Sequence, residues 1–197
     1  MKTVKSSSNA LKYFQLATIV FFAAIFGFST SAQAQVYKTV GGSIKVLGTS
    51  NLHDWEMVAQ NVPADAQFTI KGNQVQDISS FNFTLPVKSL KAKEDLMNSR
   101  AYKAMKADKF ATITFKLASA EVSQSVVKAT GALTIAGTTK QVTLQGKAVE
   151  NADGTVTVSG SRKIKMSEFG ITPPTFMLGA LKVGDEVTVE YTLKLKN

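Results

Sequence analysis

Apolar and polar residues alternate along most of the chain, which is the pattern of β-strands that bury one face. The most regular run lies near the C-terminus, where every second residue is apolar and the residues between are polar or charged. Its apolar positions are Val187, Val189, Tyr191, Leu193 and Leu195. Other runs with this period lie at residues 36–47, 52–59, 66–70, 81–87, 113–117 and 156–166. The pattern predicts eight or nine short antiparallel strands.

A β-hairpin is predicted at residues 128–149, where two alternating runs flank a glycine-containing segment. Each run places small or apolar residues on one face: Ala129, Gly131, Leu133 and Ile135 before the turn, and Val142, Leu144, Gly146 and Ala148 after it. We expect the loop at residues 136–140, because Gly137 can take the positive φ that such a loop needs. Glycine and alanine replace bulky residues in both strands, which is one way to leave room inside a curved sheet.

The period changes at residues 92–109, where apolar residues recur at spacings of three and four. They are Leu96, Met97, Ala101, Ala104 and Met105, and no glycine or proline interrupts the segment. We predict an amphipathic helix whose apolar stripe covers the sheet. The methionines and Tyr102 are interpreted as packing residues rather than as a cofactor site.

Many short strands with one helix imply an antiparallel barrel or a sandwich. Few prolines protect strand edges, so a closed barrel is the better prediction. Trp55 faces the interior on this pattern, with His53 on the same side. Two interpretations of the interior stay open: the aromatic residues fill it, or they line a cavity.

The segment between Gly170 and Gly184 is a proline-containing loop with unusually many apolar side chains. Loops usually lie at the surface, so Phe176, Met177, Leu178 and Leu181 need a location that explains them. We predict that residues 172–181 act as a portal to the barrel, with a fixed plug of one barrel end as the alternative.

Residues 1–34 read as a cleaved secretory signal peptide and are excluded from the fold. Three lysines precede an apolar run at residues 14–28, which Ala32-Gln33-Ala34 follows as a cleavage site. The apolar run is shorter than the roughly 20 residues of a spanning helix, which disfavours an uncleaved anchor. The mature protein is then one domain at residues 35–197, exported to the periplasm or secreted.

The whole chain has a formal charge of +9, and the predicted mature part keeps 20 basic residues against 14 acidic ones. Its lysines are scattered along the strands, without an arginine-rich run among aromatics, so nucleic-acid binding is not expected. Weak attraction to an anionic membrane surface is compatible with this charge.

The sequence offers little for catalysis. It has one histidine, no cysteine and no G-x-S-x-G motif, so no nucleophile and base pair can be proposed. Because neighbouring residues of a strand face opposite sides, His53 and Asp54 cannot act as a dyad there. The carboxylates are not clustered around the histidine, so no metal site is predicted. We therefore expect a protein without enzymatic activity, metal or cofactor.

Three motifs occur in a characteristic order: G-A-L-T-I-A-G-T-T-K-Q-V-T-L from Gly131, S-E-F-G-I from Ser167 and V-G-D-E-V from Val183. Together they resemble the YceI-like family of exported proteins, over essentially all of the mature chain. The resemblance implies a lipocalin-like, up-and-down antiparallel barrel whose apolar interior binds a long-chain lipid such as a polyisoprenoid. The chain departs from the family pattern at Phe110-Ala111, where Tyr-Pro is common, and at Met166, where an arginine is frequent. Both departures remove a polar or charged group near the predicted cavity, so the ligand's head group is expected to differ from that of other family members.

The leading hypothesis is an exported carrier that holds an apolar chain inside the barrel. The alternative is an accessory protein that docks to a membrane partner without a lipid cargo. For the carrier, the candidate ligand-binding residues share an apolar side chain predicted to face the interior or its mouth. They are Trp55, Phe68, Phe81, Phe83, Phe115, Phe169, Phe176, Met177, Leu178 and Leu181.

Overall fold

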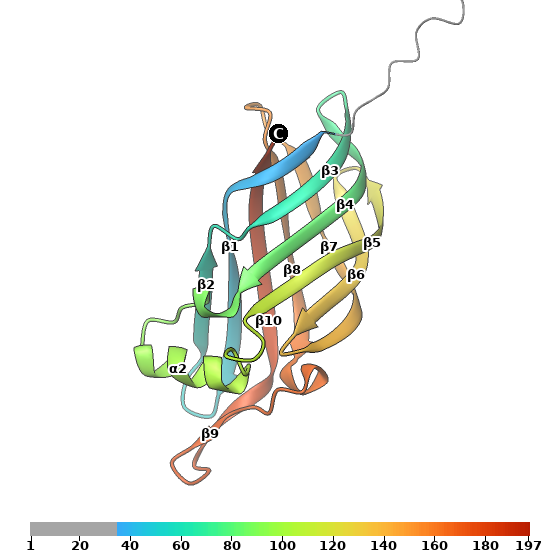
Figure 1. Ribbon diagram of the computed structural model, residues 1–197. Coiled ribbons are helices and arrows are strands. Elements are labelled where there is room, and N and C mark those ends of the chain that lie inside the picture. The colour runs from blue at the N-terminus through green and yellow to red at the C-terminus, as the bar shows by residue number, and fades with distance from the viewer. Residues whose placement is uncertain (1–34) are drawn as a thin grey trace, which may run out of the picture. The chain divides into compact units, whose positions relative to one another are not determined.

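The first and last long strands, β1 (Val36–Ser50) and β10 (Leu181–Lys196), pair antiparallel and close the sheet into a barrel (Figure 1). The computed structural model describes residues 35–197, so the predicted signal peptide lies outside the described residues. Eight strand positions form the ring, because β2 (Trp55–Gln60) and β3 (Ala64–Lys71) pair with successive parts of β1 and share one position. The predicted antiparallel barrel is confirmed.

The remaining strands follow one another around the barrel, each paired with its neighbour in sequence from β3 to β8, and β10 pairs with β8. They are β4 (Gln74–Pro86), β5 (Thr112–Ser123), β6 (Val126–Ile135), β7 (Thr138–Glu150), β8 (Val156–Lys165) and the short β9 (Thr175–Phe176). Three helical segments lie between strands: η1 (Val87–Ser89), α2 (Asp95–Ala104) and η2 (Met166–Phe169). In Figure 1, α2, η2 and β9 gather at one end of the barrel.

Helix α2 is shorter than the predicted helix at residues 92–109. At its start, the buried Asn98 side chain accepts a hydrogen bond from the Ala92 N–H (2.7 Å), which holds the chain before the helix in a loop. At its end, Lys106 adopts a φ of 53°, in the left-handed region that interrupts a right-handed helix. The apolar spacing identified the helix, and these two local features set its ends.

The hairpin between β6 and β7 has a two-residue turn, so the loop expected at residues 136–140 is wrong in its extent. Ile135 pairs with Thr138 directly, and Ala136 and Gly137 take φ values of 49° and 81°. Two successive positive φ values define the tight turn that matches the twist of antiparallel strands. Thr138, Thr139 and Lys140 therefore belong to β7.

The glycines of this hairpin do not leave the free space that the sequence suggested. A Cβ atom on Gly131 would lie 2.5 Å from the Phe115 ring, and one on Gly146 would lie 2.3 Å from the Ser159 carbonyl oxygen. Gly131 therefore accommodates an aromatic ring from the neighbouring strand, while Gly146 allows the close approach of another strand's backbone.

The two ends of the barrel differ in how they are filled. At the end away from α2, Tyr37 and Phe68 pack edge to face with ring centroids 5.1 Å apart, and both are buried. Ala148, Val156 and Leu195 are fully buried in the same part of the barrel. Close packing there closes this end of the barrel.

Candidate functional site: a cavity inside the barrel

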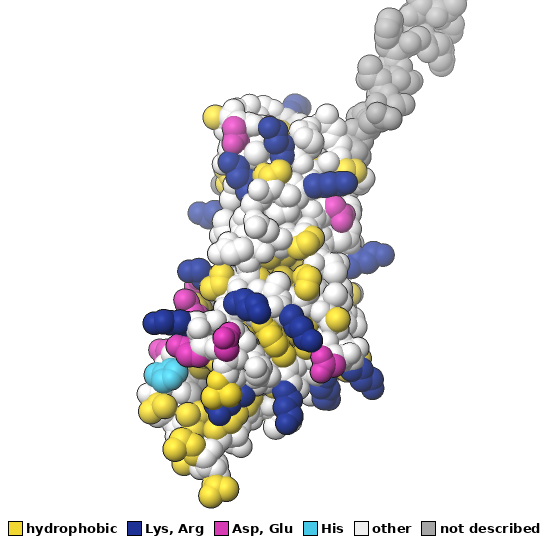
Figure 2. Space-filling view, turned by 60° about the vertical axis from the view of Figure 1, so that its left-hand side comes forward, with side chains coloured by type: hydrophobic (Ala, Val, Ile, Leu, Met, Phe, Trp, Pro, Cys, Tyr) yellow, Lys and Arg dark blue, Asp and Glu magenta, His cyan; other side chains and the backbone are white. Residues whose placement is uncertain are grey.

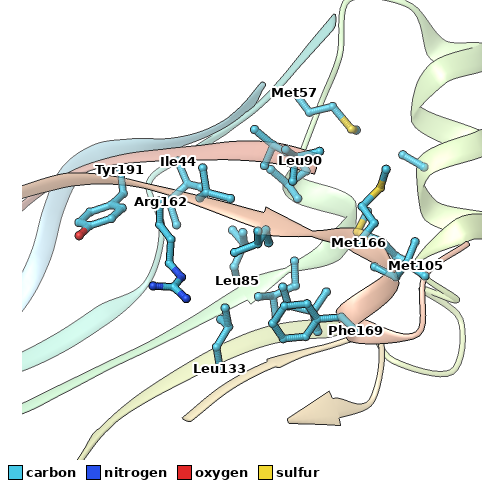
Figure 3. A pocket seen from close by; sticks show the side chains of 18 of the residues that line it. Ile44, Met57, Leu85, Leu90, Met105, Leu133, Arg162, Met166, Phe169 and Tyr191 are labelled. Atoms are coloured by element: carbon cyan, nitrogen blue, oxygen red, sulfur yellow. The ribbon is translucent and has the colours of Figure 1, made fainter. Parts of the chain in front are cut away.

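A cavity of about 510 Å³ lies inside the barrel and opens at the end near α2. Its walls are inward-facing residues of β4, β5, β6, β8 and β10, and its mouth is formed by α2, η2 and the β9–β10 segment. Figure 3 shows that the side chains in it are mostly apolar, with Leu85, Leu133 and Phe169 among them. Its volume is within the usual range of small-molecule sites.

An aromatic cluster forms one wall. Phe83 stacks on Phe115 with centroids 6.0 Å apart and an interplanar angle of 18°, and Phe81 meets Phe115 edge on at 6.4 Å. Phe83 and Phe115 are direct cross-strand partners in β4 and β5, which explains why alternating positions bring these rings together. Phe115 is only 2% exposed and anchors the cluster.

At the mouth, α2 contacts the β9–β10 segment. The Arg100 guanidinium carbon lies 3.9 Å from the centroid of the Phe176 ring, a cation–π contact that joins the two. Phe176 and Leu181 line the cavity, and so do Met97 and Ala101 of α2. Helix and hairpin therefore define the opening together.

Residues 175–182 form a small hairpin rather than the loop without strand pairing that we predicted. Phe176 pairs with Leu181 and Thr175 with Lys182, and Met177 and Leu178 lie at the tip. The Met177 side chain is 77% exposed, and Leu178 is fully exposed. Figure 2 shows hydrophobic side chains gathered at this end of the barrel.

Two of the sequence motifs meet beside the mouth. The Ser167 N–H and hydroxyl donate to the two carboxylate oxygens of Asp185, at 2.8 and 2.5 Å. These hydrogen bonds lower the pKa of Asp185. Because Ser167 belongs to η2, the Asp185 carboxylate fixes the 3₁₀ turn that presents the buried Phe169 to the cavity.

Among the charged residues that line the cavity, Glu94 and Arg100 lie at the mouth, whereas Arg162 of β8 projects into the interior. Its guanidinium donates to the Thr143 carbonyl oxygen, and its Nε is buried without a hydrogen-bond partner. The nearby Tyr191 hydroxyl donates to the Gln145 carbonyl oxygen (3.3 Å), and burial raises the pKa of Tyr191, with Arg162 acting in the opposite direction. Arg162 was not among the predicted site residues, although its even-numbered spacing from Ile164 was a usable signal.

The ten predicted ligand-binding residues fall into two groups. Seven line the cavity: Trp55, Phe81, Phe83, Phe115, Phe169, Phe176 and Leu181. The other three lie elsewhere. Phe68 packs against Tyr37 at the filled end, and Met177 and Leu178 point outward from the hairpin tip.

His53 lies at the mouth, before β2 begins. Its Nδ1 lies 2.8 Å from the Asp54 carbonyl oxygen, and the side chain is exposed. Trp55 borders the cavity as its parity indicated, and its Nε1 donates to the Thr49 carbonyl oxygen (3.1 Å). Within residues 35–197, no three His, Cys, Asp or Glu side chains are grouped as metal ligands would be.

The fold and cavity define a class: an eight-stranded, lipocalin-like β-barrel that is open at one end and has an apolar interior. A family model described as the YceI-like domain matches residues 27–195, and the chain belongs to this family. The resemblance found in the three motifs is confirmed. Comparison with curated proteins gave no match.

Solved structures share this fold. BcnA of Burkholderia cenocepacia has a TM-score of 0.66 at 20% identity, covering 78% of this chain and 95% of that one. A polyisoprenoid binding domain from Saccharophagus degradans has a TM-score of 0.61 at 11% identity, covering 81% and 97%. The YceI protein of Campylobacter jejuni has a TM-score of 0.54 at 20% identity, covering 66% and 79%.

Proposed function

We propose that this protein is an exported, non-enzymatic carrier that holds the apolar chain of a lipid inside the barrel. The observation that carries this proposal is the open cavity of about 510 Å³ with a largely apolar wall. Burying a methylene group contributes about 0.8 kcal/mol, so one isoprene unit contributes roughly 3 to 4 kcal/mol before the costs of association. A few units would bind firmly without polar contacts.

A polyisoprenoid-like chain is the ligand class we favour, since the Saccharophagus degradans neighbour is a polyisoprenoid binding domain. We propose that the seven predicted residues lining the cavity contact this chain.

We infer export from the signal-peptide pattern at residues 1–34. The helices within residues 35–197 are too short or too polar to cross a membrane. The competing function is an accessory protein that docks to a membrane partner without cargo.

Native mass spectrometry of the full chain, expressed with its leader and purified after export, tests the carrier function. We expect a mass above that of the processed polypeptide, and organic extraction should release a lipid that accounts for the difference. The same protein, stripped of lipid, should rebind a fluorescent isoprenoid. A stripped protein that takes up no isoprenoid or other long-chain lipid would favour the accessory function.

We also propose that the β9–β10 hairpin is the portal for this ligand and contacts the lipid bilayer through its tip. Met177 and Leu178 adopt φ values of 52° and 56°, a conformation that usually selects asparagine or glycine. Large apolar residues in an exposed, strained turn are costly for a purely structural segment. Phe176 and Leu181 of the same hairpin line the cavity, so the tip connects directly to the mouth.

Replacing both Met177 and Leu178 by serine should slow lipid transfer to anionic vesicles several-fold. The melting temperature should stay unchanged, because both side chains are already exposed. The measurement is the transfer rate of a fluorescent isoprenoid to phosphatidylglycerol vesicles. Serine at Val40 and Val126, two exposed apolar positions on other strands, is the matched control. A lower melting temperature with an unchanged transfer rate would instead indicate a fixed plug.

A further inference from the structure

Both arginines of the chain line the cavity, while its many lysines lie almost entirely elsewhere. Arg100 lies at the mouth against Phe176, and Arg162 projects from β8 into the interior (Figure 3). A guanidinium differs from an ammonium because its planar fork binds a carboxylate or phosphate through two hydrogen bonds. The location of Arg162 therefore calls for a specific explanation.

Arg162 has no acidic partner among the described residues. The four ion pairs within residues 35–197 all use lysine, and the one acidic residue that lines the cavity is Glu94, at the start of α2. Of the five N–H groups of Arg162, one donates to the Thr143 carbonyl oxygen, and the Nε–H is buried without an acceptor. Tyr191, whose pKa is raised by burial, stays neutral at ordinary pH and supplies no countercharge.

An unpaired charge beside an apolar wall costs free energy that a bound anion would offset. We propose that the cavity takes a single-chain lipid with a small anionic end group, a carboxylate or phosphate, held by the Arg162 guanidinium. This inference rests on the carrier function and specifies its ligand. The Tyr191 hydroxyl and the Arg162 guanidinium together form a polar patch inside a largely apolar cavity.

This site also sets the direction of the ligand. Arg162 lies four residues before Met166 of the mouth, which corresponds to about 13 Å along the strand. The anionic group then enters first and the chain extends from Arg162 past Leu133 and Phe115 to the opening. The ligand's tail, not its head group, lies at the hairpin.

A competition experiment with the purified full-length gene product tests this assignment. Palmitic acid, methyl palmitate, hexadecanol and hexadecyl phosphate compete with the neutral probe Nile red for the stripped protein. We expect the two anions to displace the probe at concentrations about tenfold lower than the two neutral lipids, as a charged hydrogen bond would give. The better of the two anions identifies the end group.

The preference for anionic lipids should disappear in Arg162→Met, which replaces the guanidinium by an apolar side chain of similar length. It should be reduced in Arg162→Lys, which keeps the positive charge but loses the planar pair of N–H donors. Lys163→Met is the matched control, because it removes the same charge from the adjacent, outward-facing position of β8. It should retain the full preference. In the wild type, the Arg162 Nε–H signal in a ¹⁵N NMR spectrum should shift with palmitate and not with methyl palmitate.

Equal affinity for acid and ester in the wild type would overturn the Arg162 site and leave the carrier function intact. A preference that survives Arg162→Met, or an Arg162 signal that palmitate does not move, would overturn it as well. If the wild type binds neither Nile red nor any of the four lipids, the carrier function itself fails.

Discussion

Ala129→Phe is expected to weaken lipid binding at least tenfold while the barrel stays folded. Ala129 lies on β6 and faces the cavity, and its direct partners in the adjacent strands are the similarly inward-facing Ala120 and Leu144. A phenylalanine ring there would extend into open volume rather than into packed side chains. Because the eight-stranded barrel has little spare width, one ring is enough to divide the cavity.

The expected size of this effect is at least tenfold in affinity for a fluorescent isoprenoid, measured by titration of the stripped protein. One isoprene unit excluded from the cavity removes roughly 3 to 4 kcal/mol of burial, which corresponds to more than a hundredfold if nothing compensates. The melting temperature should remain close to that of the wild type, since the added ring is itself buried among apolar groups.

Ala132→Phe is the matched control. Ala132 lies three residues further along β6 on the outer face, opposite Lys116 and Gln141. The same substitution there adds the same ring without entering the cavity, so affinity should not change. Wild-type affinity in Ala129→Phe would mean that the lipid binds outside the barrel, which contradicts the proposed carrier.

The strands of the barrel could be predicted because one face of each is buried. The alternation at residues 187–195 reappears as the inward row of β10, and Phe81, Phe83 and Leu85 reappear as the inward row of β4. Hydrophobic periodicity reports this burial directly. The features that the period does not encode were missed: the turn at Ala136, the short hairpin at residues 175–182 and the ends of α2.

The site was predicted in its chemistry more than in its extent. Alternation shows which residues face inward. It does not show where along the barrel axis packed side chains give way to an open cavity. Phe68 and Phe83 have the same pattern, and only the three-dimensional structure shows that Phe68 meets Tyr37 at the filled end. Bulges also break the period, as in β4, where Leu85 is buried at an odd position and Ile78 at an even one beyond the register shift, so an assignment by parity fails across a bulge.

Arg162 was overlooked for a related reason. A charged residue in an alternating run is ordinarily assigned to the outer face, because burying an isolated charge is unfavourable. The neighbouring positions in β8 are Ser161 and Lys163, so the local pattern is polar on both faces. Its parity was the available signal, because Arg162 shares the even-numbered row of β8 with Val158 and Ile164.

Phe115→Ala should cause the largest loss of stability of any single aromatic truncation in the cavity wall. Phe115 is 2% exposed, stacks on Phe83, meets Phe81 and covers Gly131, so its removal leaves space that none of these groups can readily fill. Buried phenylalanine-to-alanine changes cost about 3 to 5 kcal/mol. Urea unfolding should show a lower midpoint with an unchanged slope, because the surface exposed on unfolding hardly changes. Phe81→Ala, at a partly exposed position of the same cluster, should cost clearly less. Equal losses for the two variants would contradict the view that Phe115 anchors this wall.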